Sequence, residues 1–328
     1  MTKELVFVTG ASGFVGANLV RLLLQQGYKV RALLRSSSSR RSLTGLDLEI
    51  VEGDLHHPHL AEQLQGCRYL FHVAAHYSLW RKDRAAVIHT NVEGTKHILA
   101  AARQAKIERT VYTSSVAAIG ASNVPVDESY QSPPQKLIST YKLSKYLAEQ
   151  VAKEAANHQD LVIVNPSTPI GAWDAKPTPT GEIILRFLRR QMPFYVETGL
   201  NFIHVEDVAW GHLLALTQGK RGDRYILGHQ NLSLKAFLDQ LAQITGLPAP
   251  QTQISPIVPL IVATLDELIL APLGKTPSIS IDSVRMASQK MYYNPHKAVT
   301  ELGLPQTPIS QAIATAVDWY RASELLSS

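Results

Sequence analysis

The stretch LVFVTGASGFVGANLVRLLLQ, residues 5–25, decides the fold of this chain. It begins with an apolar run typical of a buried strand and ends with leucines at helical spacing. Between them stand three glycines, which a dinucleotide-binding turn needs for its tightness, for close approach of the backbone to a diphosphate, and for packing of the helix on the strand. The free N–H groups at the start of the helix would bind the diphosphate. The predicted cofactor contacts are Gly10, Gly13, Phe14, Val15 and Gly16.

The alternation of strand and helix continues through the first half of the chain. Apolar runs such as KVRALLR, CRYLFHVAA, RTVYTSS and LVIVNPS are separated by segments of helical period, notably residues 84–105 and 137–157. This pattern predicts an α/β fold with a doubly wound parallel sheet of the Rossmann type. After Asn165 the pattern loosens and prolines become frequent. We therefore expect a nucleotide-binding domain at residues 1–165 and a smaller, interwoven substrate-binding lobe at 166–328, part of which returns to the sheet through DRYILG, residues 223–228.

The composition excludes several classes of protein. The chain has 328 residues, of which 45% are hydrophobic and 18% are charged, as in ordinary globular proteins. Its single cysteine, Cys67, rules out an intramolecular disulfide, and no export signal precedes Gly10, so we expect a cytoplasmic protein. The net charge is +5, but no basic stripe indicates a nucleic-acid partner. No metal site is predicted, because His56, His57 and His59 lack cysteine or regularly spaced carboxylate partners.

The longest apolar region, residues 257–273, contains two prolines and two acidic residues. It falls well short of the roughly 20 uninterrupted apolar residues that span a bilayer. We therefore expect no integral membrane segment and predict a helix that lies in the core or at an interface. Contact of this helix with a membrane surface or a lipid substrate stays open.

The end of the second predicted strand indicates which dinucleotide binds. An acidic residue about 20 positions after the glycine turn would hold the ribose 2′-hydroxyl of NAD, but this chain has Leu34 and Arg35 there. A guanidinium can bind a 2′-phosphate, and the sequence offers no adjacent carboxylate to repel that phosphate. This predicts NADP, with NAD as the less favoured cofactor. The alternative is that Arg35 is a solvated loop charge, and Arg40 and Arg41 either assist it or point into water.

Three residues form a candidate catalytic group. Tyr141 and Lys145 stand four residues apart in YKLSK, so a helix places them on one face. A nearby ammonium stabilises a phenolate and lowers the pKa of a tyrosine, which can then act as general acid or base. Ser115 ends the predicted strand RTVYTSS, and ligands of open α/β sheets bind outside the carboxyl ends of strands. Ser115 is predicted to orient a substrate oxygen, whereas capping of the next turn is predicted for Ser114.

Taken together, the motifs resemble the extended short-chain dehydrogenase/reductase family, which includes NAD-dependent epimerases and dehydratases. The resemblance rests on TGASGFVG, GDL at 53–55, HVAA at 72–75, Asn91, TSS, YKLSK and NPS at 165–167, in the family's order over essentially the whole chain. The stretches NPSTPIG, KPTPTG, NFIHVEDVAWGHLLAL and RYILG are similar to the dihydroflavonol 4-reductase-like branch. Within that branch they resemble bacterial hopanoid-associated sugar epimerases.

The resemblance implies a role for each matching residue. Tyr141 would exchange the proton, Lys145 would lower the pKa of Tyr141 and hold the nicotinamide ribose, and Ser115 would hold the reacting oxygen. Further cofactor contacts are implied at Asp54 and Leu55 beside the adenine, Ala74 and Ala75 at the fourth strand, and Pro166 and Ser167 beside the nicotinamide amide. Structural roles are implied for Asn91, His72 and His204, the last of these beside Asp207. A homodimer through residues 84–105 and 137–157 is implied as well.

The predicted substrate pocket is apolar and aromatic, which fits a hydrophobic, amphipathic or lipid-linked alcohol or ketone. Its predicted lining is His76, Tyr77, Trp80, Val116, Thr178 and Phe202. Nucleotide-sugar epimerases of the family carry a diphosphate-binding arginine where this chain has Leu200, so Arg186, Arg189 or Arg190 would have to replace it. We therefore predict reduction of a ketone or aldehyde, or the reverse oxidation. Sugar epimerisation is the alternative, and a non-enzymatic NADP redox sensor is a third, disfavoured because Tyr141 and Lys145 are both kept.

Overall fold

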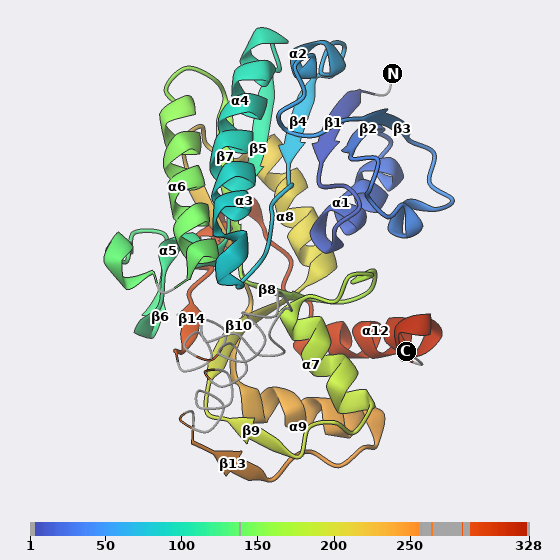
Figure 1. Cartoon of the computed structure of the whole chain (residues 1–328), viewed down its shortest axis with the longest axis vertical. Helices are drawn as coiled ribbons and strands as arrows, with labels where there is room; N and C mark the ends of the chain where they lie inside the picture. Colours follow the sequence, from blue (N-terminus) through green and yellow to red (C-terminus); the bar gives the residue numbers. More distant parts are fainter. Residues whose placement is uncertain are drawn as a thin grey trace.

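A seven-stranded parallel sheet forms the centre of the larger domain of the computed structural model (Figure 1), which describes residues 4–137, 139–255, 257, 264, 284 and 289–326. The strand order is β11-β7-β5-β4-β1-β2-β3, and each neighbouring pair is parallel. The predicted Rossmann-type α/β fold is therefore confirmed. The strands are β1 (Leu5–Thr9), β2 (Lys29–Leu34), β3 (Glu49–Glu52), β4 (Tyr69–His72), β5 (Arg109–Thr113), β7 (Leu161–Pro166) and β11 (Arg224–Leu227).

Helices cover both faces of this sheet, as its apolar strands require. On one face α1 (Phe14–Gln25) packs against α8 (Val205–Gln218) over the side chains of Val6, Val8 and Val164. On the other face α4 (Gly94–Gln104) and α6 (Thr140–Ala155) cover Phe7, Leu70 and Ile163. Shorter helices in this domain are α2 (Leu60–Gln63), α3 (Arg84–Ile88) and α5 (Val116–Ile119).

A second lobe lies beyond the carboxyl ends of the parallel strands (Figure 1). This lobe has its own hydrophobic core. Its sheet has the order β12-β10-β14-β6, with β8 also paired to β10, and β9 pairs separately with β13. The strands are β6 (Ser122–Val126), β8 (Thr168–Ile170), β9 (Phe194–Val196), β10 (Gly199–His204), β12 (Gln230–Ser233), β13 (Thr252–Ile254) and β14 (Met291–Tyr293). The helices are α7 (Pro179–Leu188), α9 (Leu234–Thr245) and α12 (Ile309–Ala322).

The two halves of the sequence exchange elements. Strand β11 and helix α8 come from the second half but complete the parallel sheet and one of its faces. Conversely, β6 precedes residue 165 but joins the sheet of the second lobe. We propose that residues 1–165 mainly bind the nucleotide and residues 166–328 mainly bind the substrate, with these exchanged elements joining the two.

The apolar region at residues 257–273 lies almost entirely outside the described residues. Among the helices that the structure describes, none is both long enough and apolar enough to cross a membrane.

Phe237 anchors the core of the second lobe. Its ring is fully buried and stacks on that of Phe202, with 4.7 Å between the ring centroids. Replacing Phe237 with Ala leaves a cavity that the surrounding side chains cannot fill, so we expect a loss of about 3–5 kcal/mol in the free energy of unfolding. Denaturant titration measures this loss. Gln243→Ala, at an exposed position of the same helix, is the control, and a loss below about 1 kcal/mol for Phe237→Ala would contradict the packing described.

Candidate active site

The glycine turn between β1 and α1 is shaped so that only glycine fits. Gly10 has a φ of +72°, and a Cβ atom there would stand 2.6 Å from the backbone nitrogen of Ala74. A Cβ atom on Gly16 would overlap the carbonyl oxygen of Gly10. Gly13 is the N-cap of α1, where no side chain caps the helix and the first turn holds no acidic residue. The first N–H groups of α1 are thus open to an anionic ligand.

The other predicted cofactor residues lie where neighbouring parallel strands end. Ala74 donates its N–H to Thr9 Oγ1 (3.2 Å) after β4, and Ala75 next to it is exposed. Asp54, exposed after β3, accepts a hydrogen bond from the His56 N–H (2.8 Å), whereas Leu55 is buried. Arg35 is exposed directly after β2. The fold therefore brings these residues to the same edge of the sheet as the glycine turn.

One feature of this edge was missed by the sequence interpretation. Glu52 pairs in register with Leu34, so a carboxylate stands on the strand beside the expected 2′-phosphate position. Arg40 approaches this carboxylate at 4.0 Å, and Arg41 pairs with Glu324 at 2.9 Å. The expectation that no carboxylate lies nearby was wrong, because strand β3 is contiguous with β2 only in three dimensions. Arg35 has no such pairing among the ion pairs of the described chain.

Tyr141 and Ser115 form the centre of the candidate site. Ser115 is the N-cap of α5, where its Oγ accepts the Ala117 N–H (3.1 Å). With that oxygen held, its hydroxyl can donate to the phenol of Tyr141. Burial raises the pKa of Tyr141 to about 12, and the hydrogen bond from Ser115 opposes this rise. The phenol is accordingly protonated at neutral pH and is suited to donate a proton.

Lys145 is buried on the same face of α6 but does not bond to the phenol. Its Nζ donates to the carbonyl oxygen of Thr113 (2.8 Å) and lies 5.3 Å from the ring centre of Tyr112. Burial lowers the pKa of Lys145 to about 8, against the opposing effect of the Glu149 carboxylate. The expected lowering of the Tyr141 pKa by Lys145 is therefore not found in this structure, because burial dominates and the ammonium is directed at a backbone carbonyl.

Glu149, one turn after Lys145, is a central residue that the sequence interpretation missed. Its fully buried carboxylate accepts hydrogen bonds from Ser114 Oγ (2.7 Å), Asn165 Nδ2 (2.7 Å) and Arg224 (2.8 Å). Lys153 lies 3.1 Å from the same carboxylate. Ser114 therefore serves this network. The prediction that Ser114 caps the next turn was wrong, because Ser115 is the residue that caps α5. The only signal in the sequence was a glutamate four residues beyond Lys145.

A second hydrogen-bonded chain runs from β1 to the catalytic helix. His72 lies between Thr9 Oγ1 (2.8 Å) and Thr95 Oγ1 (3.1 Å), and the hydroxyl of Thr95 donates to the Asn91 carbonyl (2.6 Å). Asn91 Nδ2 donates to Ser144 Oγ (2.9 Å), which donates to the Tyr141 carbonyl (2.7 Å). Burial, helped by the charge of Lys145, lowers the pKa of His72 to about 3. His72 is thus a neutral structural residue and Asn91 links it to α6.

The predicted substrate residues divide into two groups. The ring of Tyr77 is 41% exposed and meets the Tyr141 ring edge-on, with 4.7 Å between the centroids. Val116 follows Ser115 directly, His76 is bonded to Asn91, and Trp80 is half-buried in the same loop. Thr178 and Phe202 have structural contacts instead: Thr178 caps α7 and bonds to Asp174 (2.8 Å), and Phe202 stacks on Phe237 in the core. Of the first group, Tyr77 contacts the Tyr141 ring, whereas Val116 is buried in a core cluster.

The remaining histidines give no catalytic or metal site. His204 caps α8 by accepting the Glu206 N–H (3.0 Å), while Asp207 instead accepts hydrogen bonds from Thr307. Within the described ranges no cluster of three or more histidine, cysteine or acidic side chains is arranged to hold a metal ion. Leu200 packs against the core of the second lobe, at the position where an arginine would bind a diphosphate.

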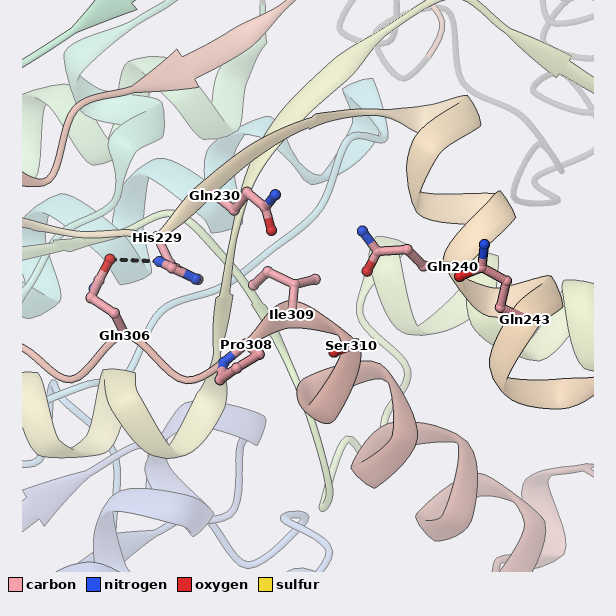
Figure 2. Close-up of a pocket in the computed structure, with 8 residues that line it drawn as sticks. All are labelled: His229, Gln230, Gln240, Gln243, Gln306, Pro308, Ile309 and Ser310. Carbon is pink, nitrogen blue, oxygen red and sulfur yellow. Dashed lines mark hydrogen bonds between the residues drawn. The ribbon is translucent and has the colours of Figure 1, made fainter.

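A hollow of about 670 Å³ in the second lobe lies apart from the predicted site residues (Figure 2). His229 Nδ1 bonds to Gln306 Oε1 (2.6 Å) on one side, and Gln240 and Gln243 project from the facing helix α9. The lining contains no acidic or basic side chain other than His229. We assign it no role in the reaction.

The residues present fit a dinucleotide. The glycine turn is tight because Cβ atoms on Gly10 and Gly16 would collide with the backbone, and the N–H groups at the start of α1 are free of side-chain caps. On the opposite side of the sheet centre, the Oγ atom of Ser167 is buried and lacks a hydrogen-bond partner within the described chain. A buried hydroxyl without a partner destabilises the fold unless a bound group supplies the missing hydrogen bond. Ser167 follows β7, at the position expected for contact with the nicotinamide amide.

Comparisons with known proteins agree with this geometry. The model of the NAD dependent epimerase/dehydratase family matches residues 6–228. A Synechocystis sp. protein provisionally named a dihydroflavonol 4-reductase is 62% identical over 322 residues, 96% of this chain and 94% of its own. Sterol demethylase protein B of Methylococcus capsulatus is 35% identical over 327 residues, 96% of this chain and 97% of its own.

Two solved structures are similar over nearly the whole chain. The crystal structure of gox2253 has a TM-score of 0.86 and 41% identity, and the alignment covers 98% of both chains. The structure of PA4631, a nucleoside-diphosphate-sugar epimerase from Pseudomonas aeruginosa, has a TM-score of 0.81 and 26% identity over 98% of this chain and 99% of its own.

The Glu149 network predicts a large and pH-dependent effect on stability. Burial raises the pKa of Glu149. The charges of Arg224 and Lys153 lower it by a larger amount, so the pKa of Glu149 lies below its usual value of 4.5. A carboxylate whose pKa is lower in the folded state than in the unfolded state stabilises the fold at pH values above its unfolded-state pKa. That stabilisation is lost as the pH falls through the folded-state pKa. Glu149→Gln leaves Arg224 uncompensated, so we expect a loss of about 3–5 kcal/mol at pH 7 that shrinks below about pH 4.5.

Urea titration of the wild type and the variant between pH 7 and pH 3 measures this difference. Glu154→Gln, at an exposed position of the same helix, is the control and should change stability by less than about 0.5 kcal/mol. A Glu149→Gln loss that is small, or independent of pH, contradicts the network.

Proposed function

This chain belongs to the NAD dependent epimerase/dehydratase family, and we propose that within the family it is an NADP-dependent reductase of ketones or aldehydes. The observation that carries the proposal is the half-buried, protonated phenol of Tyr141, hydrogen-bonded to Ser115 at the edge of the sheet that holds the glycine turn. A protonated phenol at that position supports proton donation to a carbonyl oxygen. The same groups run in reverse for oxidation of the alcohol.

In this proposal residues at the carboxyl ends of the parallel strands would hold the cofactor. The turn formed by Gly10, Gly13, Phe14, Val15 and Gly16 would bind its diphosphate. Arg35 binds the 2′-phosphate, Asp54 and Leu55 lie beside the adenine, and Ala74 and Ala75 line the path at β4. Pro166 and Ser167 would contact the nicotinamide amide, and this amide would supply the hydrogen-bond partner that the Ser167 hydroxyl lacks. When bound, NADPH supplies the hydride.

The chain's own residues bind the substrate and move the proton. With substrate bound, Ser115 donates its single hydroxyl hydrogen to the substrate oxygen instead of to the Tyr141 phenol, and so fixes the distance of that oxygen from Tyr141. As negative charge develops on that oxygen, Tyr141 gives up its phenolic proton to it. Lys145 holds the nicotinamide ribose. Glu149 keeps Lys145 protonated, since its carboxylate raises the pKa of that lysine.

The exposed face of the site favours a hydrophobic or amphipathic substrate. Tyr77 gives it an aromatic wall against the Tyr141 ring, and Trp80 lies half-buried in the same loop. The names of the two curated relatives, a dihydroflavonol 4-reductase and a sterol demethylase protein, point in the same direction. PA4631 favours sugar epimerisation as a second candidate, but the apolar setting of Leu200 leaves the diphosphate of a nucleotide sugar without its arginine.

We also propose a cytoplasmic homodimer. The cytoplasmic location is supported by the free, buried thiol of Cys67, and the dimer by the family resemblance of the helices within residues 84–105 and 137–157. These helices cover one face of the sheet, and Tyr141 lies in the first turn of α6.

Tyr141→Phe tests the proton donor. Removing the phenolic hydroxyl removes general acid catalysis, so we expect turnover to fall by about 10²–10⁴-fold while the Kd for NADPH stays the same. Stopped-flow reduction of a hydrophobic ketone and fluorescence titration with NADPH measure the two quantities. Tyr146→Phe, on the same helix, is the matched control. Turnover retained in Tyr141→Phe rejects the proposed chemistry.

Arg35→Ala tests the choice of cofactor. Loss of a charged hydrogen bond to the 2′-phosphate is expected to raise the Kd for NADPH about tenfold and to leave the Kd for NADH unchanged. Titration of both nucleotides against the wild type, Arg35→Ala and the exposed control Arg103→Ala gives the answer. Equal affinity of the wild type for NADH and NADPH would contradict the assignment of Arg35.

A further inference from the structure

Lys142, the residue after Tyr141, is a buried ammonium that lacks a charged partner. Its side chain is only 1% exposed, and its one hydrogen bond runs to Gln289 Oε1 at 3.4 Å. No carboxylate within the described ranges forms an ion pair with it. An ammonium has three donors, so most of its hydrogen-bonding capacity is unused in a place that water does not reach.

The other lysines of α6 show that this arrangement is unusual within the same helix. Lys145 donates to the Thr113 carbonyl and lies near Glu149, and Lys153 pairs directly with Glu149. Lys142 has neither compensation, and burial alone lowers its pKa to about 8. Burying a charge without a partner is expensive, so such groups concentrate at functional sites.

The position of Lys142 on its helix adds a second unfavourable interaction. Ser139 caps α6 by accepting the Lys142 N–H (3.2 Å), so Lys142 lies in the first turn. The first turn of a helix carries a partial positive charge and favours anions, yet this turn has no acidic residue. Both the helix end and the ammonium would be stabilised by the same negatively charged group.

Lys142 also lies where the two domains meet. Its partner Gln289 directly precedes the segment leading to β14, and the Gln289 carbonyl accepts a hydrogen bond from Thr198 of the second lobe (3.4 Å). Lys142 directly follows Tyr141, the proposed proton donor, in the first turn of α6, although side chains one residue apart on a helix do not face each other. A substrate that reaches both groups would extend around this turn of the helix.

We propose that Lys142 is a specificity-determining residue that binds a carboxylate of the substrate, so that the enzyme acts on a keto acid or the corresponding hydroxy acid. This inference rests on the proposed function, because it assigns the acid group of a molecule whose carbonyl is reduced beside Tyr141. The aromatic side chains of Tyr77 and Trp80 then hold its hydrophobic part. The substrate class is an amphipathic carbonyl compound with one carboxylate near the reacting carbon.

The experiment compares acids with their uncharged esters. The probes are 2-, 3- and 4-acetylbenzoate and their methyl esters, with NADPH oxidation followed in the wild type, Lys142→Met and Lys142→Arg. We expect the wild type to prefer at least one acid over its ester. Lys142→Met should reduce that ratio of kcat/KM at least tenfold, mainly through KM, and Lys142→Arg should retain part of it. Lys136→Met, at an exposed position before the helix, should keep the wild-type ratio.

Binding is measured as well, so that the result does not depend on turnover. Calorimetry in the presence of NADP should show the acids binding to the wild type more tightly than the esters, and this difference should vanish in Lys142→Met. Thermal unfolding of each variant shows whether it is folded, and Lys142→Gln is a second neutral variant if Lys142→Met is not.

Each outcome decides between the two proposals. The inference about Lys142 is overturned if the wild type and Lys142→Met show the same acid-to-ester ratio, or if the acids neither bind nor react in the wild type. In both cases reduction of the esters or of other neutral ketones leaves the reductase proposal standing. Absence of NADPH oxidation with every carbonyl compound tested rejects the reductase proposal itself.

Discussion

The buried carboxylate of Glu149 is the interaction on which the candidate site depends. It joins four parts of the chain: helix α6, the end of β5 at Ser114, the end of β7 at Asn165, and β11 at Arg224. Asn165 also donates to the carbonyl oxygen of Ser115 (3.0 Å), so the same network holds the backbone that presents the Ser115 hydroxyl. A carboxylate so deeply buried is stable only because these donors surround it. Its geometry therefore fixes the distance between Tyr141 and Ser115.

The electrostatics of the site follow from burial. Burial raises the pKa of Tyr141 and lowers the pKa of Lys145. In both residues it therefore favours the uncharged form. Two neighbours oppose this effect of burial. The hydrogen bond from Ser115 lowers the pKa of Tyr141, and the carboxylate of Glu149 raises the pKa of Lys145. A dinucleotide and substrate that enter this edge bring their own charges and hydrogen bonds. Among the lysines of α6, Lys142 has no acidic partner within the described residues, and this is the basis on which we propose that it binds a substrate carboxylate.

The sequence predicted the features that depend on local pattern. The glycine turn, the alternating strands and helices and the Tyr141–Lys145 spacing each occupy a short stretch, and the fold confirms the architecture they predict. Features that depend on strand order were missed. Assembly of the sheet is what brings Glu52 beside Leu34 and Arg224 to Glu149. The crossing of β6 into the second lobe likewise leaves no signal in the hydrophobic periodicity of the sequence. Phe202 shows the same limit, because an aromatic residue in a strand can face either the core or a ligand.

The central claim is that hydride passes to the substrate and remains there while Tyr141 supplies the proton. The most direct measurement uses NADPH deuterated at the transferring position of the nicotinamide, a ketone that the enzyme reduces, and mass spectrometry of the product. The account predicts one deuterium on the carbinol carbon for every NADPH consumed. An enzyme that returns its nucleotide unchanged and yields an epimer without deuterium would contradict it.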